Sequence, residues 1–196
     1  MELTKLGCVI LAAGSSTRLG TDKALISVGS KPLIRWLYDR LARYNFDIVI
    51  VVNESNFSRV SEVLPRSKVI VNYEPNEGRT GSLKKGISNL DVTMGDDYPI
   101  LVVPVDRPGF SNSTLHKIIE FGGSCCPALE GKGGHPLLLS SNDVSRVRMS
   151  PSDIPLREII KPKKIQVSDR YLHLNIDTQR DLKGLKEKLE FVNEEN

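Results

Sequence analysis

The chain has 196 residues, of which 39% are apolar and 26% are charged, and its formal net charge is +3. This size and composition are typical of a globular protein and predict a single domain over residues 1–196, which excludes a globally disordered chain. The small net charge and an aromatic content of only 6% argue against a nucleic-acid-binding module, because such modules usually carry a basic stripe or stacking aromatics.

The cysteines and the apolar runs indicate a cytoplasmic protein without a membrane partner. Cys8, Cys125 and Cys126 show no C-x-x-C spacing, so neither a disulfide framework nor a zinc site is indicated, and buried, reduced thiols are expected. The longest apolar runs are too short to span a bilayer. The segment from Met1 to Lys5 carries no signal-peptide pattern.

The first half of the chain alternates between predicted strands and helices. Residues 8–11 form a short, continuous apolar run, which is typical of a strand that is buried on both faces. Pro32 can open a helix, because Leu33, Leu37 and Leu41 follow at i, i+4 and i+8. The pattern then predicts strands at 47–52, 68–71 and 99–105, and helices at 55–64 and 81–89.

The second half continues the alternation. Ser111 or Asn112 can cap a helix that runs to residue 121, and Thr178 with Asp181 resembles a capping box that opens the last helix. The other predicted elements are strands at 125–129, 137–139, 165–167 and 172–176, a glycine-rich turn at 131–134 and a helix at 152–160. This order predicts a Rossmann-like α/β fold of three layers, in which helices cover both faces of a mostly parallel twisted sheet.

The loop after the first strand, residues 11–23, has the composition of an anion-binding loop. It reads LAAGSSTRLGTDK, which is neither a Walker A loop nor the G-x-G-x-x-G dinucleotide fingerprint. Its small residues would let backbone N–H groups approach a polyphosphate, and Arg18 and Lys23 add positive charge. On these residues alone, an ordinary turn with two surface cations is an equally good interpretation.

Two carboxylates are predicted at the same edge of the sheet as this loop. Asp106 follows the strand at 99–105, and Asp177 follows the strand predicted at 172–176. Each could be a simple turn or cap residue. However, ligands of open α/β sheets bind outside the carboxyl ends of the strands, and Gly14 and Gly78 also lie at such ends. The four loops together therefore predict a binding site.

The chain resembles the nucleotidyltransferases of molybdenum-cofactor biosynthesis, the branch of cytidylyltransferases and guanylyltransferases. The motifs follow the family order and extend over nearly the whole chain, from residue 6 to about 190. They are the LAAGSSTRLGTDK loop, Glu77-Gly78-x-x-Gly81-Ser82-Leu83, Val105-Asp106-x-Pro108, Gly134-His135-Pro136 and Ile176-Asp177-Thr178-x-x-Asp181-Leu182. The first loop is strongly specific for the superfamily, and Gly-His-Pro is specific only in combination with the others.

The resemblance implies a role for each motif. The phosphate loop would hold the triphosphate through Leu11, Ala12, Ala13, Gly14, Ser15, Arg18 and Lys23. Gly78, Gly81 and Ser82 would lie near the base and sugar, and His135 would lie on the acceptor side, although a structural role for this histidine is equally open. Asp106 and Asp177 would bind Mg²⁺, which suits one or two carboxylates with phosphate oxygens.

By this resemblance, the acceptor phosphate attacks the α-phosphorus of CTP or GTP, and pyrophosphate leaves. Lys23, Arg18 and Asp106 would carry the catalysis, with Lys23 acting at the α-phosphate and Arg18 holding the β- and γ-phosphates. The acceptor would be the molybdenum cofactor or molybdopterin. Ala13, where guanylyltransferases tend to have glycine, and the Gly-His-Pro motif favour CTP, whereas Asp22-Lys23 is more typical of the guanylyl branch.

Two departures from the family pattern leave alternatives open. Val105 stands where the family usually has glycine, and Arg107 replaces a more usual Gln or Met. They put the base and the acceptor in doubt more than the reaction class. The alternatives are a sugar- or polyol-phosphate acceptor and a non-catalytic nucleotide-binding protein on the same fold; the oligomeric state cannot be predicted from the sequence.

Overall fold

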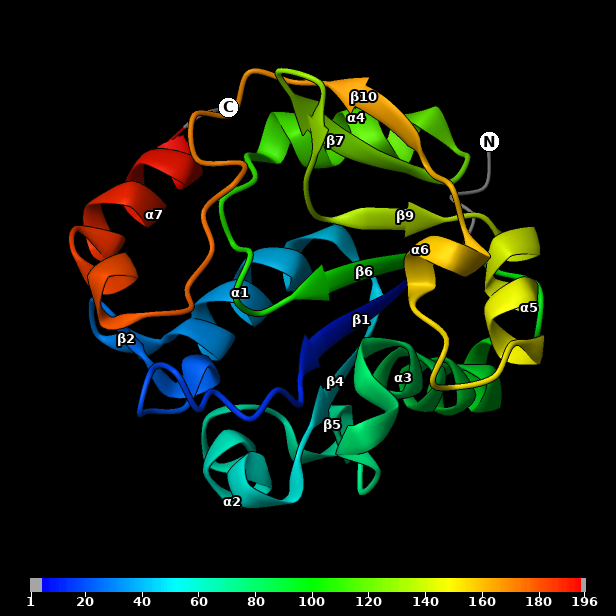
Figure 1. The fold of residues 1–196 in the computed structure, drawn as a ribbon, viewed down its shortest axis with the longest axis horizontal. Helices are drawn as coiled ribbons and strands as arrows, with labels where there is room; N and C mark the ends of the chain where they lie inside the picture. The colour runs from blue at the N-terminus through cyan, green and yellow to red at the C-terminus, as the bar shows by residue number, and fades with distance from the viewer. Residues whose placement is uncertain (1–4, 195–196) are drawn as a thin grey trace.

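The computed structural model describes residues 5–194, and an eight-stranded sheet lies at its centre (Figure 1). In chain order its strands are β1 (Gly7–Ala12), β4 (Asp47–Val52), β5 (Val69–Val71), β6 (Ile100–Pro104), β7 (Cys125–Leu129), β8 (Lys132–Gly133), β9 (Leu137–Leu139) and β10 (Lys163–Gln166). A separate two-stranded ribbon joins β2 (Ser27–Val28) and β3 (Lys31–Pro32).

The sheet is mostly parallel, as predicted. Its order is β10-β7-β9-β6-β1-β4-β5, with β8 paired to β7 at the side. The central strand β1 runs parallel to both β4 and β6, and β4–β5 and β10–β7 are parallel pairs too. Antiparallel pairing is confined to β9, between β6 and β7, and to β8. The arrowheads of β1 and β6 therefore point to the same edge (Figure 1).

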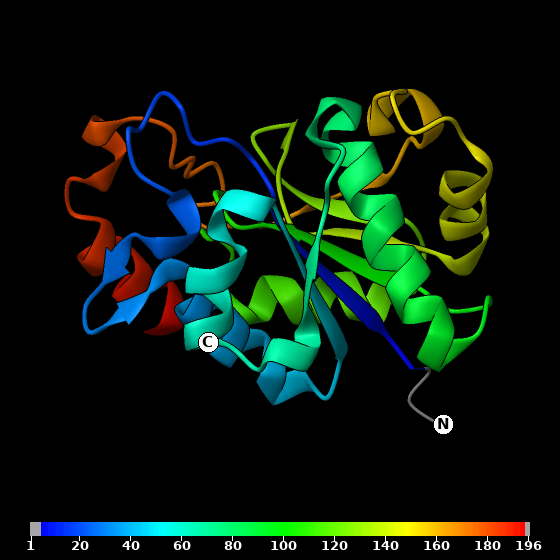
Figure 2. The ribbon, with the colours of Figure 1, turned by 90° about the horizontal axis from the view of Figure 1, so that it is seen from below.

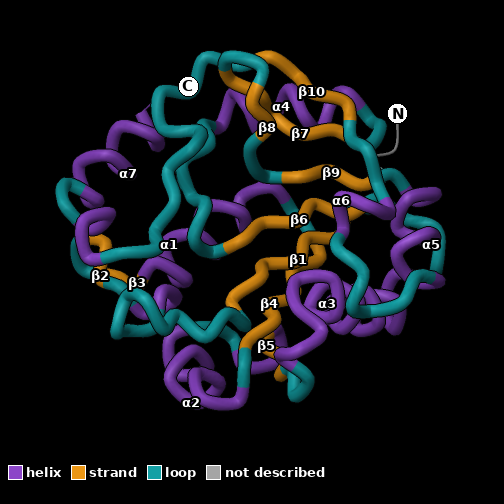
Figure 3. The backbone as a smooth tube through the Cα atoms, in the orientation of Figure 1, coloured by secondary structure: helices purple, strands orange, loops and turns teal. Residues whose placement is uncertain are grey.

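Helices cover both faces, which confirms the three layers (Figures 2 and 3). The longer helices are α1 (Leu33–Leu41), α2 (Glu54–Val63), α3 (Gly78–Met94), α4 (Asn112–Phe121), α5 (Ser141–Met149) and α7 (Leu185–Glu194), and α6 (Leu156–Ile159) is a single turn. Short 3-10 turns cover Lys23–Leu25, Ala42–Tyr44, Arg66–Lys68, Pro75–Glu77 and Gln179–Leu182. Among residues 5–194, no helix has the length and apolar character needed to cross a membrane.

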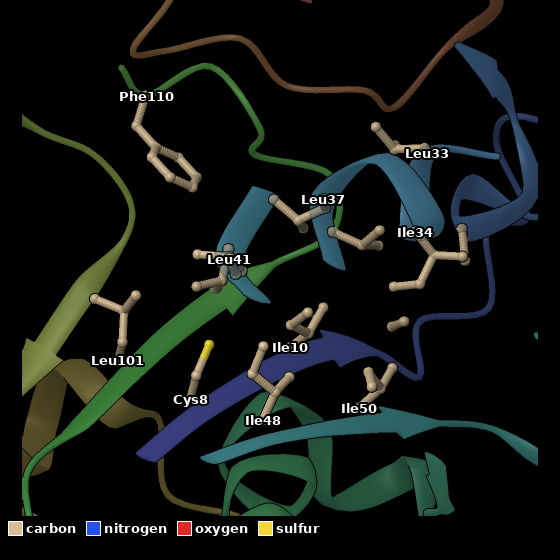
Figure 4. Close-up of a cluster of buried hydrophobic side chains, with 14 of the residues drawn as sticks. Cys8, Ile10, Leu33, Ile34, Leu37, Leu41, Ile48, Ile50, Leu101 and Phe110 are labelled. Carbon is tan, nitrogen blue, oxygen red and sulfur yellow. The ribbon is translucent and has the colours of Figure 1, made fainter. Parts of the chain in front are cut away.

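The side chains of β1 alternate between two apolar cores, because successive residues of a strand point to opposite faces. Cys8 and Ile10 belong to the core that α1, α2, α4 and α7 cover, whereas Val9 packs into the core beneath α3 and α5. Figure 4 shows the first core, with side chains of the sheet facing those of Leu33, Ile34, Leu37 and Leu41. The continuous apolar run at 8–11 thus reflects a strand buried on both faces.

Several predicted elements agree with the structure in detail. Ser111 caps α4 by accepting a hydrogen bond from the backbone of Thr114. Thr178 and Asp181 form the predicted capping box, which opens the turn at Gln179–Leu182 rather than α7 itself. The three cysteines are free and buried, and burial raises the pKa of Cys125 to about 11.

Two predictions in the second half are wrong. The helix expected at 152–160 is only the single turn α6. The longer helix in this part of the chain is α5, which precedes it. α5 is short and polar, but Ser140 caps it and the buried side chains of Val144 and Val147 anchor it. The strand expected at 172–176 is absent. Hydrogen bonds within the segment, such as Leu174 N to Tyr171 O at 2.8 Å, fold it into turns.

Candidate active site

A cleft of about 540 Å³ opens at the carboxyl ends of β1 and β6. This volume lies within the usual range for small-ligand sites. Its walls come from the phosphate loop, the start of α3, the loop after β6 and the last part of the chain. The lining residues predicted from the sequence are Leu11, Ala12, Ala13, Gly14, Ser15, Arg18, Lys23, Gly78, Ser82, Asp106 and Asp177.

The phosphate loop is held in place from α2. The side-chain amide of Asn56 donates a hydrogen bond of 3.1 Å to the carbonyl of Ala12, and that of Asn53 donates to the carbonyls of Ala13 and Gly14, both at 3.3 Å. In a trans peptide the N–H points opposite to the carbonyl. The N–H groups that follow these carbonyls therefore point away from α2, as an anion-binding loop requires.

Lys23 is positioned by its own turn. Its backbone N–H donates to Ser16 Oγ at 3.2 Å, and the carboxylate of Asp22 caps the following 3-10 turn through the N–H of Ala24 at 2.9 Å. These contacts fix the backbone at Lys23 and leave its ammonium directed at the loop after β6. Asp22, which the Asp22-Lys23 pair of the guanylyl branch would link to the choice of base, holds the backbone in this structure.

Lys23 joins two carboxylates that are far apart in the sequence. Its Nζ lies 2.8 Å from Asp177 Oδ1 and 3.4 Å from Asp106 Oδ2. Arg18 Nη1 lies 2.7 Å from the other oxygen of Asp177. The hydrogen bond from Lys23, assisted by the charges of Lys23 and Arg18, holds the pKa of Asp177 below its usual value. Asp177 is therefore a carboxylate at neutral pH.

Asp106 takes its place from the register of β6 against β1. Pro104 pairs with Leu11, and the N–H of Val105 donates to the carbonyl of Leu11 at 3.0 Å. The side chain of Val105 is buried in the core, so valine in place of glycine fits here without disturbing the next residue. Asp106 follows at the point where the strand leaves the sheet.

Asp177 reaches Asp106 along the loop after β6, although no strand precedes it. The N–H of Ile176 donates to the carbonyl of Asp106 at 3.0 Å, which brings the two segments side by side (Figure 1). The approach depends on Gly109, where a Cβ would lie 1.9 Å from the carbonyl oxygen of Tyr171. Asp181 then fixes the turn by accepting hydrogen bonds from the N–H groups of Asp177 and Thr178.

The two carboxylates fit a divalent cation that is carried by phosphate. Within residues 5–194, no group of three or more His, Cys, Asp or Glu side chains forms a complete metal cage. Mg²⁺ does not need one, since it usually binds to one or two carboxylates plus phosphate oxygens and water. Basic and acidic side chains balance in the cleft lining: Arg18, Lys23 and Arg79 against Asp22, Asp106 and Asp177. A triphosphate would thus need a cation of its own here.

A second pocket, of about 500 Å³, adjoins the cleft. The two share Leu11, Gly78, Arg79 and Pro104, which we call the neck. Apolar side chains of α3, β6, β9 and α6 form most of the walls of the second pocket, and His135 lies among them. Burial, with the charges of Arg79 and Arg107, lowers the pKa of His135 to about 4.

The cleft thus gathers most of the predicted site residues, with two exceptions. Gly81 is absent from its lining and packs on Glu77, where a Cβ would lie 2.3 Å from the Glu77 Cβ. His135 lines the adjoining pocket instead. Sequence reasoning missed Arg79, which lines both pockets, and also Asn53, which caps α2, and Asn56 in its first turn. The spacing of Asn53 and Asn56 directly after a strand was the available signal for a helix start.

Several known proteins are similar to this chain. The family model described as "MobA-like NTP transferase domain" matches residues 8–169. The chain is 30% identical over 123 residues to molybdenum cofactor guanylyltransferase of Xanthomonas euvesicatoria pv. vesicatoria, which covers 62% of this chain. It is 33% identical over 121 residues to 2-C-methyl-D-erythritol 4-phosphate cytidylyltransferase of Bifidobacterium longum, which covers 57% of it.

Solved structures share the fold over almost the whole chain. The structure of Rv0371c from Mycobacterium tuberculosis has a TM-score of 0.76 at 24% identity and covers 95% of this chain and 100% of that one. A manganese complex of Rv0371c is also similar, with a TM-score of 0.71 at 21% identity, over 94% and 99% of the two chains. The sequence matches are shorter: they span 58% of the guanylyltransferase and 41% of the cytidylyltransferase. Bifunctional protein GlmU of Bifidobacterium longum subsp. infantis is 28% identical to this chain over 118 residues. That match covers 58% of this chain but only 26% of GlmU.

Proposed function

Because this chain belongs to the MobA-like NTP transferase domain family, we propose that it transfers a nucleotidyl group from a nucleoside triphosphate to a small phosphorylated acceptor. One observation carries the proposal beyond the family name. Lys23 of the phosphate loop is held between the carboxylates of Asp106 and Asp177. Phosphoryl-type transfer requires positioning and charge neutralisation, and this cluster offers both.

The reaction would proceed by in-line displacement. An oxygen of the acceptor phosphate forms a bond to the α-phosphorus, the bond from that phosphorus to the α–β bridging oxygen breaks, and pyrophosphate leaves with the electron pair. A phosphate acceptor is largely ionised at neutral pH, since its second pKa is about 6. No side chain is therefore needed as a general base.

Each group in the cleft has a task in this scheme. The amides of the phosphate loop and Arg18 bind the β- and γ-phosphates, and Lys23 stabilises the charge that develops at the α-phosphate. Asp106 and Asp177 would hold a divalent cation, which we propose to be Mg²⁺ and which would neutralise phosphate charge. Lys23 then exchanges its contact with the carboxylates for one with phosphate oxygen.

We propose the molybdenum cofactor, or molybdopterin, as the acceptor and CTP as the preferred triphosphate. The guanylyltransferase relative supports the acceptor. Ala13 supports the preference for CTP, because its methyl group in the cleft lining leaves less room for a purine base than glycine would. One methyl-sized contact discriminates by only about 1–3 kcal/mol, so GTP is expected to react slowly, and Ala13→Gly should narrow the gap.

A polyol-phosphate acceptor is the second candidate, because the cytidylyltransferase relative has the higher identity of the two, 33% against 30%. Pyrophosphate release tests both candidates. The purified chain would be given each of the four common triphosphates with Mg²⁺, with and without molybdopterin or 2-C-methyl-D-erythritol 4-phosphate. Release with CTP that depends on molybdopterin supports the proposal, and release only with the polyol phosphate favours the second candidate. Nucleotide binding without release under any condition would indicate a non-catalytic protein.

A further inference from the structure

The neck between the two pockets carries a cation that the scheme above does not use. Arg79 is 68% exposed and its Nη2 lies 3.9 Å from Asp106 Oδ2. Lys23 and Arg18 line the nucleotide cleft, and Arg157 lines the second pocket, but among these cations Arg79 lines both. Its guanidinium can therefore reach a group that is held between the triphosphate and the second pocket.

An in-line reaction needs a second phosphate site, for the nucleophile. In an in-line displacement, the attacking and leaving oxygens lie on opposite sides of the α-phosphorus. The leaving phosphates would lie on the side of the phosphate loop and Arg18, which contacts Asp177 at 2.7 Å. The attacking phosphate then needs a cation on the side away from the leaving group, and the second pocket, which adjoins the cleft at Arg79, offers room for the acceptor there. Arginine is suited to this task because its fork binds phosphate in a bidentate manner.

A buried nitrogen atom of a residue in the wall of the second pocket, His135 Nδ1, has no hydrogen-bond partner within the described residues. Buried polar groups are nearly always paired, so an unpaired one in a pocket wall points to a partner supplied by a ligand. His135 is uncharged at neutral pH and can offer an N–H without repelling a neighbouring arginine.

The walls of the second pocket are mainly apolar. Leu83, Val102, Leu137, Leu156, Ile160 and Pro162 line it, and its polar lining comes from Glu77, Arg79, Thr80, His135, Asp153 and Arg157. Hydroxyl groups of a polyol that faced the apolar part of these walls would lose their hydrogen bonds to water, which is unfavourable. A ring with an apolar face would instead bury its surface there.

We propose that Arg79 binds the acceptor phosphate at the neck and that the second pocket holds an acceptor body with an apolar, ring-like face rather than a polyol. The proposal rests on the proposed function and deepens it. It makes Arg79 and the wall of α6 determinants of acceptor specificity, separate from the groups that bind the triphosphate.

The test uses simple phosphomonoesters as probes. Dissociation constants of 1-naphthyl phosphate, glycerol 3-phosphate and inorganic phosphate would be measured by ligand-observed NMR with the whole chain. Naphthyl phosphate should bind at least tenfold more tightly than glycerol phosphate. Arg79→Gln should weaken naphthyl phosphate by about ten- to a hundredfold, as expected for a lost charged hydrogen bond, and leave CTP affinity within about twofold.

Two further variants make the result specific. Leu156→Gln should weaken the binding of naphthyl phosphate but not of inorganic phosphate, because it changes only the apolar wall of the second pocket. Arg146→Gln is the matched control, since Arg146 is an exposed arginine of α5, paired with Asp143, and lines neither pocket; it should bind every probe as the wild type does.

Contrary results would separate this proposal from the function on which it rests. Unchanged probe binding in Arg79→Gln, or weakened CTP binding instead, overturns the role of Arg79. Equal or tighter binding of glycerol phosphate overturns the inference about the acceptor body. Either result can occur while CTP still binds and pyrophosphate is still released. Failure to bind any triphosphate would instead contradict the proposed function.

Discussion

The ammonium of Lys23 donates a hydrogen bond of 2.8 Å to the carboxylate of Asp177, a residue 154 positions away in the sequence. This contact ties the phosphate loop at the start of the chain to the turn that precedes its last helix. Asp106 lies within 3.4 Å of the same ammonium. The ammonium of Lys23 is thus held between the carboxylates of Asp106 and Asp177 without any bound ligand.

Removing Lys23 should affect the rate more than the affinity. Lys23→Ala is expected to lower kcat by about a hundred- to a thousandfold, as for other groups that stabilise charge in a transition state, with a smaller effect on triphosphate binding. Arg18→Ala should mainly raise the Kd of the triphosphate. Steady-state kinetics together with calorimetric titration separate the two effects. Similar losses of affinity in both variants, with kcat unchanged, would contradict this division of roles.

Activity should depend on a divalent cation through Asp106 and Asp177. EDTA should abolish pyrophosphate release and added Mg²⁺ should restore it. Asp106→Asn should lower turnover by at least about a hundredfold, yet leave the free energy of unfolding close to that of the wild type, because a loop carboxylate contributes little to the core. Asp97→Asn, an exposed carboxylate distant from the cleft lining, is the control. Wild-type turnover in Asp106→Asn would remove this residue from the site.

Gly109→Ala should damage both stability and activity. The added Cβ would lie 1.9 Å from the carbonyl oxygen of Tyr171, so one of the two backbone segments must move, at a cost of about 1–3 kcal/mol or more. Because the displaced segment leads to Asp177, activity should fall even under conditions where the variant is fully folded. Denaturant unfolding and turnover at low temperature test the two effects. A variant with wild-type stability would show that the segments are not tightly packed.

His135 should make the protein less stable in mild acid. Its pKa is lowered to about 4 in the folded state, from an ordinary value of 6.5, by burial and by Arg79 and Arg107, with Asp106 acting weakly in the opposite direction. Between pH 6.5 and 4 only the unfolded state takes up the proton, so stability falls as the pH falls, by at most about 2–3 kcal/mol.

The comparison with His135→Gln isolates this effect. The free energy of unfolding of both proteins would be measured by urea titration from pH 7.5 to pH 4. The variant should lose less stability than the wild type over this interval, because carboxylates elsewhere titrate in both. Parallel curves would mean that His135 takes up its proton at the same pH in the folded and the unfolded protein.

The sequence predicted the fold well where one physical signal was dominant. The apolar run at 8–11 marked a central strand because both of its faces are buried, and small residues with two cations marked the loop that follows. Prediction from the sequence failed where tertiary contacts decide the conformation. Apolar Leu172 and Ile176 suggested a strand, yet they pack into the core from turns. Polar α5 gave no clear pattern because only two of its residues are buried.

The candidate site shows the same division. Asp106 could be placed from the strand before it, since the carboxyl ends of parallel strands meet at one edge. Arg79 could not, because an exposed arginine in the first turn of a helix has no sequence feature that separates it from a solvated surface charge. Its position depends on which pockets meet at the neck, and that depends on the packing of α3 against β1 and β4.

The central claim is that the α-phosphorus of the triphosphate is attacked, and isotope tracing tests it most directly. CTP labelled with ³²P at the α-position or at the γ-position would be incubated with the chain, Mg²⁺ and molybdopterin. The account predicts that the α-label enters the acceptor product while the γ-label leaves in pyrophosphate. Transfer of the γ-label to the acceptor, or its release as inorganic phosphate with no α-label transferred, would contradict it.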